Sequence, residues 1–501
     1  MKIYKNKYLF FAIAMVFTMG SCSEDFLEVE PKGTNLEANY YQNEDQAFAG
    51  LIAVYDVMRK NSGGFENIIT MMNAGSDDNY AGGGNSSDGV GIQSFSNFTM
   101  NANTTPRSFW SDPYQGIYRA NILLQKLPNV PMSDANKVRF AAETKALRAY
   151  YYFGLVNMFR NVPLILEPIP QSEIYNVVQA SPEAVYAQIE SDLLDAIPVL
   201  PAIVDKKTDA GRFTKGAAQA LLGKVYLYQN KKSQAAAQFE QVNGTPGSAS
   251  QYGYRLLDNY ADLWVVSNKF NSESILEVTH TQLGASGWGN WGQGSDEGNS
   301  VNIMVGPRGY SKNGAAAPDL PSGWSFNPFT EDLYNAMASD PRLAATVLNL
   351  KQLVADKQAT YIAGFQDTGY FLNKFTPRTK DVTTGSGDAV LNYRQDTYAI
   401  RLADTYLMEA EALGSGPRAQ ALLDAVRARV GLPSVPVNQN SIMEERRMEL
   451  AGEGFRFYDL VRTGQAAAKL SNRGFVAGKN EIFPIPYQEL ENTKIVQNPN
   501  Y

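Results

Sequence analysis

The chain has 501 residues, of which 44% are hydrophobic and 19% are charged, as in a globular protein with a large core. Length alone suggests about three domains. The formal net charge of −7 argues against a nucleic-acid binder, because such proteins normally present a basic surface.

The first 21 residues have the pattern of a bacterial signal peptide. Lys2, Lys5 and Lys7 form a positive start, and residues 8–19 form an apolar run within the roughly 7–15 residues that such signals use. Cys22, the only cysteine in the chain, follows and resembles the acylated first residue of a lipoprotein. We therefore predict lipidation of Cys22. The alternative is a plain secretory signal followed by a chance cysteine.

A lipid on Cys22 leaves no thiol for a disulfide, so the fold has to rely on its apolar core. No later run approaches the roughly 18 apolar residues that span a bilayer. We expect a protein that is anchored to a membrane rather than built into it. Residues 22–42 are predicted to be a tether, since Pro31 and Gly33 oppose an early helix.

Helical periodicity accounts for most of the chain up to residue 245. Apolar residues recur every three or four positions over 43–60, 110–127, 133–159 and 181–197. Between residues 61 and 97 the composition changes to Gly, Ser, Asn and Asp, which predicts an exposed loop system.

Two pairs of helices are predicted with very short connections, 211–230 with 232–242 and 398–413 with 417–430. The first helix of each pair places Leu four residues before Tyr. Small residues beside large ones in paired helices are typical of tetratricopeptide-like packing, in which each pair buries its face on the next. We expect a mainly α fold with a tetratricopeptide-like helical-pair body. A large loop-rich, strand-containing insertion is expected to form the ligand face.

Residues 250–395 break the helical pattern. Residues 274–283 alternate enough to predict a strand, and a long stretch rich in Gly, Asn and Ser follows. Such a stretch is usually either functional or disordered. Its loops over 284–330 are rich in aromatic residues, which disordered segments lack, so we interpret them as functional.

Few residues suit catalysis or metal binding. The single histidine, His280, lies on the predicted strand and is interpreted as structural, and it leaves no room for a two-histidine metal site. Residues 287–292 match G-x-G-x-x-G, but the residues after them cannot open the helix that a nucleotide site requires. Acidic residues are plentiful, yet no pair stands out as the two carboxyls of a glycosidase. We predict no enzyme and no cofactor.

The first loop system offers oxygen donors of the kind that bind calcium, in Asp77, Asp78, Asn79 and Asp88. They match only part of the EF-hand pattern, because Ala81 occupies its fifth position. A solvated polar turn is the simpler interpretation, and a calcium ion between Asp77 and Asp88 is the alternative.

An exposed indole can bury the apolar C–H face of a sugar ring while nearby polar side chains bond its hydroxyls. The candidates for such a platform are Trp288, Trp291, Trp324 and Tyr310. The candidates for its polar edge are Asp77, Asp78, Asn79 and Tyr80. The alternative for each tryptophan is an anchor that packs a loop onto the helices.

Residues 444–464, EERRMELAGEGFRFYDLVRTG, carry charges at helical spacing. On one helix they would form a ladder that joins Arg446 to Glu449 and runs from Glu453 through Arg456 and Asp459 to Arg462. Two glycines inside the stretch predict either a close packing partner or a break. We interpret the charges as a structural ion-pair network rather than an active site.

This stretch resembles the C-terminal signature of the SusD/RagB family, the surface glycan-binding lipoproteins of Bacteroidetes. Further segments resemble the family in the same order, among them AETKALRAYYYFGLVNMFRNVPLI, GRFTKGAAQALLGKVYLY, RLADTYLMEAEAL and the closing QNPNY. Asp404 stands where the family usually carries Glu. Residues 23–26 resemble the short acidic signal that sends such lipoproteins to the outer face of the outer membrane.

The resemblance implies non-catalytic capture of an oligosaccharide or polysaccharide by a lipoprotein that faces outward from the outer membrane. It also implies delivery of that glycan to a SusC-like TonB-dependent transporter. The alternative is a helical-repeat lipoprotein that captures peptides for the same kind of transporter. An N-terminal SusD-like helical region is expected over 43–245, and a C-terminal RagB/SusD region, including the loops 284–330, over 246–501.

Overall fold

The structure is a computed structural model that describes residues 40–501. The predicted signal peptide, Cys22 and nearly all of the tether lie outside the described residues. In the described part of the chain, no helix is both long enough and apolar enough to cross a bilayer.

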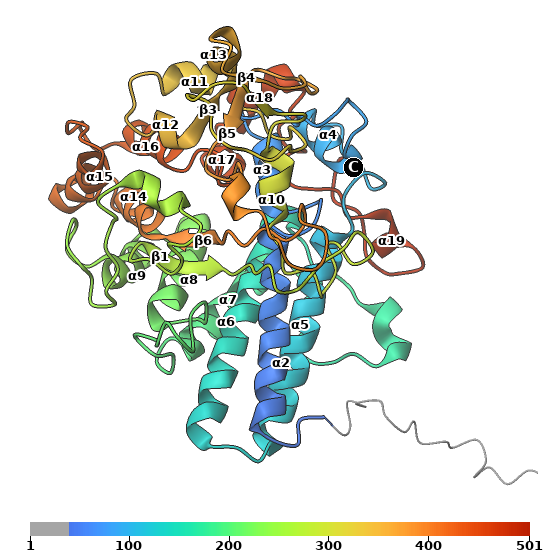
Figure 1. Ribbon diagram of the computed structural model, residues 1–501. Helices are drawn as coiled ribbons and strands as arrows, with labels where there is room; N and C mark the ends of the chain where they lie inside the picture. Colours follow the sequence, from blue (N-terminus) through green and yellow to red (C-terminus); the bar gives the residue numbers. More distant parts are fainter. Residues whose placement is uncertain (1–39) are drawn as a thin grey trace, which may run out of the picture.

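A stack of long helices forms the body of the fold, and Figure 1 shows α2, α5 and α6 side by side in it. Within this body α6 packs on α7, α8 on α9 and α14 on α15, and neighbouring pairs touch through α7–α8 and α9–α14. This succession confirms the expected tetratricopeptide-like packing. The helices are α2 (Glu44–Asp56), α5 (Ser108–Lys126), α6 (Asp134–Phe159), α7 (Pro182–Ala196), α8 (Lys215–Tyr228), α9 (Lys232–Asn243), α14 (Leu402–Leu413) and α15 (Pro417–Arg429).

Local sequence explains where these helices begin and how closely they pack. The side chains of Asn43, Ser133 and Ser181 each accept a hydrogen bond from the backbone N–H three residues on, which satisfies a donor that the helix leaves unpaired. Within the α8–α9 pair, Gly223 leaves room for Phe239. A Cβ atom at Gly223 would lie 2.8 Å from that ring.

The predicted helix over 398–413 is wrong in its first turn. Residues Thr397–Arg401 form strand β6, which pairs antiparallel with β1 (Ser274–Val278), and α14 begins only at Leu402. The same pairing confirms the first half of the strand predicted over 274–283. Thr397, Tyr398 and Ile400 are residue types that are common in strands, but only pairing with the distant β1 makes this buried segment a strand.

Short elements make up the rest of the chain, many of them in the upper part of Figure 1. Two further antiparallel ladders join β2 to β4 and β3 to β5. These strands are β2 (Ser311–Lys312), β3 (Val347–Asn349), β4 (Ala359–Thr360) and β5 (Tyr370–Leu372). The short helices are α3 (Ile68–Ala74), α4 (Val90–Ser96), α10 (Ser300–Val305), α11 (Glu331–Ala336), α12 (Leu343–Thr346), α13 (Leu350–Ala355), α16 (Gln439–Glu449), α17 (Arg456–Arg462), α18 (Ala466–Leu470) and α19 (Tyr487–Leu490).

The stretch 444–464 forms two helices, α16 and α17, instead of one. Gly452 and Gly454 lie between them with φ of +79° and +84°, a conformation that favours glycine, so the chain breaks there. The predicted ladder is therefore wrong in most of its pairs. Within the described chain only Asp459–Arg462 forms, at 2.6 Å.

The charges of this stretch reach across the fold instead. The buried Arg401 donates to the carboxylates of Glu273, Glu449 and Glu453 at 2.7–2.9 Å. Arg342, equally buried, bonds to Glu449 at 2.8 Å. The network thus ties α16 to β1, β6 and the residues before α12, which is the structural role that we predicted for it.

One large apolar cluster draws its buried residues from both predicted regions. Leu147 and Leu222 from the N-terminal side and Tyr406 and Ile485 from the C-terminal side all belong to it. The division at 245/246 stays a prediction.

Candidate functional site

Three tryptophans from two loops meet in one cluster. Trp288 and Trp291 lie on the loop between β1 and α10, and Trp324 lies on the loop after β2. Ring centroids are 5.7 Å apart for Trp288–Trp291, 5.4 Å for Trp291–Trp324 and 6.0 Å for Trp288–Trp324. Trp288 and Trp324 are stacked, whereas Trp291 meets both rings edge-on. We call these three residues the tryptophan cluster.

Trp288 is the outermost member of the cluster. It is 56% exposed, while Trp291 and Trp324 are half-buried. The ring of Phe65 packs against both of these, with centroids at 5.8 and 6.3 Å, and the Trp291 indole N–H donates to Ser300 Oγ at 2.8 Å. Two tryptophans are therefore held in place from below, and they support a third that faces solvent.

Glycines allow the Trp288 loop to lie against the chain that carries Phe65. Gly292 and Gly64 have φ of +73° and +76°, and a Cβ atom at Gly64 would lie 3.1 Å from the Gly292 Cα. Such a close backbone approach leaves no room for side chains. The next helix after residues 287–292 is α10, which begins only at Ser300, so no helix N-terminus follows the G-x-G-x-x-G match directly.

Polar side chains lie beside the tryptophan cluster. Asp388 Oδ2 accepts a hydrogen bond from the Trp288 backbone N–H at 3.2 Å. Arg308 Nη2 donates to the Trp324 carbonyl at 3.3 Å and lies 3.4 Å from Asp88 Oδ2, and its side chain is 37% exposed. Sequence reasoning missed Arg308, Asp388 and Phe65 as parts of this site.

The fourth predicted platform residue, Tyr310, is placed elsewhere. Its hydroxyl donates to the Pro318 carbonyl at 2.6 Å, and its ring packs against a small apolar cluster that includes Leu320 and Leu348. Within residues 40–501 no ring contact joins Tyr310 to the tryptophan cluster.

The four residues predicted for the polar edge, Asp77–Tyr80, make contacts inside the fold. Asp78 and Asn79 are each 1% exposed. Asp78 accepts from Arg447 at 2.7 Å and Asp77 from Arg456 at 2.8 Å, while the Arg473 guanidinium lies over the Tyr80 ring at 4.8 Å. These four residues bind the C-terminal segment, so we leave them out of the candidate site.

The same contacts account for the charges that suggested calcium. Burial opposes ionisation of Asp77, but its hydrogen bonds to Arg456 and the charge of that residue outweigh burial and lower its pKa. Asp88 accepts from the Gly84 N–H and faces Arg308. In the described part of the chain, no three His, Cys, Asp or Glu side chains are grouped to hold a metal ion. The solvated-turn interpretation is also wrong for Asp78 and Asn79, because both are buried.

His280 is buried within hydrogen-bonding distance of neutral partners. Its Nε2 lies 2.6 Å from Ser62 Oγ and its Nδ1 lies 3.1 Å from the Glu297 carbonyl. Burial lowers the pKa of His280 to about 4. Ser62 has no exposed surface, so the serine–histidine pair is out of reach of a substrate and the structural interpretation of His280 holds.

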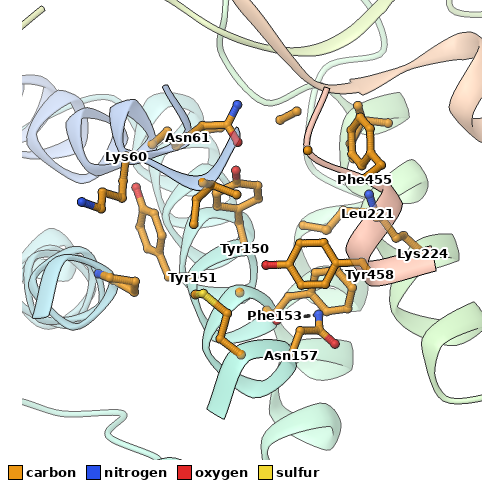
Figure 2. Close-up of a pocket in the computed structure, with 18 of the residues that line it drawn as sticks. Lys60, Asn61, Tyr150, Tyr151, Phe153, Asn157, Leu221, Lys224, Phe455 and Tyr458 are labelled. Atoms are coloured by element: carbon orange, nitrogen blue, oxygen red, sulfur yellow. Dashed lines mark hydrogen bonds between the residues drawn. The ribbon is translucent and has the colours of Figure 1, made fainter. Parts of the chain in front are cut away.

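A cavity of 140 Å³ lies where the helical body meets the segment 453–458 (Figure 2). Tyr150, Tyr151 and Tyr458 line it, together with Lys60 and Lys224. Ligand sites in proteins usually measure about 300–1,000 Å³. The cavity is too small for a sugar chain.

Comparison with known proteins identifies relatives along most of the chain. Residues 25–227 match a family model described as starch-binding associating with outer membrane, and residues 340–501 match one described as the SusD family. A solved structure titled laminarin binding SusD-like protein is 68% identical, with a TM-score of 0.91, and the match covers 92% of this chain and 100% of that one.

More distant relatives have the same fold. Surface glycan-binding protein A from Bacteroides fluxus is 27% identical, with a TM-score of 0.80, over 92% of this chain and 100% of that one. A SusD-like protein of Bacteroides ovatus is 26% identical over 92% of this chain and 83% of its own length.

Proposed function

This chain belongs to the SusD family, and from that premise we propose that it captures a glycan without cleaving it, on the tryptophan cluster. The observation that carries the proposal is the convergence of three indoles from two loops, with Trp288 left 56% exposed. Trp291 and Trp324 pack against Trp288, so its exposed indole offers a rigid apolar surface to a sugar ring.

The chemistry beside the cluster suits sugar hydroxyls. Arg308 supplies hydrogen-bond donors, Asp388 supplies acceptors, and Asn290 adds an amide on the same loop as Trp288. We propose a neutral β-glucan of the laminarin type as the ligand, because the 68% identical structure is titled as laminarin-binding. The comparisons favour a glycan over a peptide.

Location and partner follow from the family. The model matched by residues 25–227 is described as associating with the outer membrane. We propose that a lipid on Cys22 anchors the protein there, facing outward, and that it passes its glycan to a SusC-like TonB-dependent transporter. A Cys22→Ala variant should leave the membrane fraction and fail to incorporate labelled palmitate. The wild-type protein should co-purify with a transporter from outer membranes.

Laminarin binding by single-site variants tests the platform. Protein that begins at residue 23 should bind laminarin in calorimetry, and Trp288→Ala should raise the Kd roughly tenfold or more. Losing the burial of a large apolar side chain costs about 1.5–3 kcal/mol. Trp291→Ala should weaken binding as well. Trp324→Ala also removes core packing, so its melting temperature has to be measured alongside.

Tyr175→Ala is the matched control, because Tyr175 is 61% exposed and lies on another element, a short helix over 171–176. It should bind laminarin like the wild type. If Trp288→Ala and Trp291→Ala also bind like the wild type, the tryptophan cluster is not the binding site. Shortened laminarin chains after incubation with the protein would contradict the non-catalytic part of the proposal.

A further inference from the structure

A second pocket, separate from the tryptophan cluster, lies between the segment 261–267, helix α12 and the segments 373–381 and 393–395. Its volume is 620 Å³, inside the range of about 300–1,000 Å³ that ligand sites occupy. None of Trp288, Trp291 and Trp324 lines it. Its wall includes another indole, Trp264.

The wall of this pocket carries cations that lack acidic partners. Arg378, Lys380 and Arg394 line it, and within residues 40–501 none of them has a carboxylate oxygen within 4.0 Å. Arg378 donates only to neutral groups, the Thr376 carbonyl at 2.6 Å and Asn373 Oδ1 at 2.7 Å.

Lys380 and Arg394 are exposed and Arg378 is half-buried, and they differ from the buried arginines of the fold. Arg401 and Arg446, for example, each bond to two or more carboxylates. Burial lowers the pKa of Arg378, and the opposing charge of Asp381, which is more than 4.0 Å away, does not reverse that effect. In a chain whose net charge is −7, a group of unpaired cations is a local exception. It attracts anions to the pocket.

Polar atoms without partners lie in the same wall. Trp264 Nε1, Asn302 Oδ1 and the Tyr393 hydroxyl have no hydrogen-bond partner within the described chain. Asn302 and Tyr393 are 1% and 2% exposed. Buried polar groups in native proteins are nearly always bonded, but these three atoms have essentially no accessible surface, so an occupant would reach them only if the wall opened around it.

We propose that this pocket is a second ligand site, for an acidic sugar that carries a carboxylate or a sulfate group. Lys374, Arg378, Lys380 and Arg394 outnumber Asp381, the one acidic side chain in the lining, and the arginines favour oxyanions through charge-assisted hydrogen bonds. The volume exceeds that of an inorganic anion. The Trp264 ring in the lining offers a sugar an apolar wall.

Calorimetry with glucuronic acid, glucose 6-sulfate, glucose and inorganic sulfate tests this site on the chain that begins at residue 23. At least one of the two acidic sugars should bind, and the affinity should fall as salt is added. Arg378→Gln and Arg394→Gln should each weaken that binding roughly tenfold, the usual effect of losing one charge-assisted contact. Laminarin binding should not change in either variant, because the pocket is separate from the tryptophan cluster.

Arg107→Gln is the control, because Arg107 is a 58% exposed arginine that is paired with Glu489 on another part of the surface. It should bind acidic sugars like the wild type. If Arg378→Gln lowers the melting temperature, the exposed Arg394→Gln decides the outcome. Which acidic sugar binds distinguishes a carboxylate site from a sulfate site.

The proposal is wrong if neither acidic sugar binds, if both arginine variants bind the acidic sugars like the wild type, or if glucose binds with equal affinity. Inorganic sulfate that binds as tightly as glucose 6-sulfate would show that the sugar is not recognised. A failed laminarin experiment would not affect these results, because the tryptophan variants test the cluster and the arginine variants test the second pocket.

Discussion

Replacing Arg401 by Met should destabilise the fold strongly. Arg401 has no exposed surface, and its guanidinium donates five hydrogen bonds to Glu273, Glu449 and Glu453. Breaking a buried ion pair by removing one partner typically costs about 3–5 kcal/mol, because the other charge stays buried without compensation. Methionine refills part of the volume. The three carboxylates also keep their other cationic partners. We therefore expect the free energy of unfolding to fall by an amount near the lower end of this range, about 3 kcal/mol.

Urea denaturation followed by circular dichroism measures this cost as a shift of the midpoint at unchanged slope. Lys351→Met is the matched control. Lys351 pairs with Glu331 at 2.8 Å, but the two side chains are 59% and 62% exposed, so solvent screens the pair and the midpoint should not move measurably.

An Arg401→Met midpoint that shifts no more than that of Lys351→Met would refute the argument from burial. Laminarin affinity under native conditions is the second readout. If Arg401→Met lost laminarin binding while it kept its stability, the ion-pair network would take part in recognition, contrary to the structural role assigned to it.

Two other changes test single features of the fold. Burial and the neighbouring charge of Asp396 raise the pKa of Glu277 to about 8, so the folded protein keeps a proton that the unfolded chain releases above its ordinary pKa of 4.5. The free energy of unfolding should therefore fall as pH rises from about 4.5 to about 8, by at most about 1.4 kcal/mol per pH unit. Glu277→Gln should reduce this dependence on pH. Equal slopes of urea midpoint against pH in the wild type and the variant would contradict the prediction. Gly452→Ala should lower the melting temperature, because φ is +79° and the added Cβ would collide with Leu372 Cδ1. An unchanged melting curve would show that the turn tolerates a side chain.

The sequence by itself determined the helical body, because its signals are local. Capping residues such as Ser133 and Ser181 lie three residues from the N–H groups that they satisfy, and apolar spacing marks the buried face of each helix. The family was recognisable for a related reason. The stretch 444–464 is a contiguous run of residues, and its likeness to SusD/RagB proteins did not require any knowledge of its partners.

Only the tertiary structure decided which side chains meet. Phe65 lies under Trp291 although more than 200 positions separate them, and Arg447 reaches Asp78 over a separation of 369. Phe65, Trp291 and Asp78 lie in loops without periodicity, and the helical spacing around Arg447 carries no information about so distant a partner. Of the four aromatic residues predicted for the platform, three meet in the tryptophan cluster, whereas Tyr310 packs against another apolar cluster. The polar neighbours of the tryptophan cluster were not predicted, and Asp77–Tyr80 proved to hold the fold together instead of facing the site.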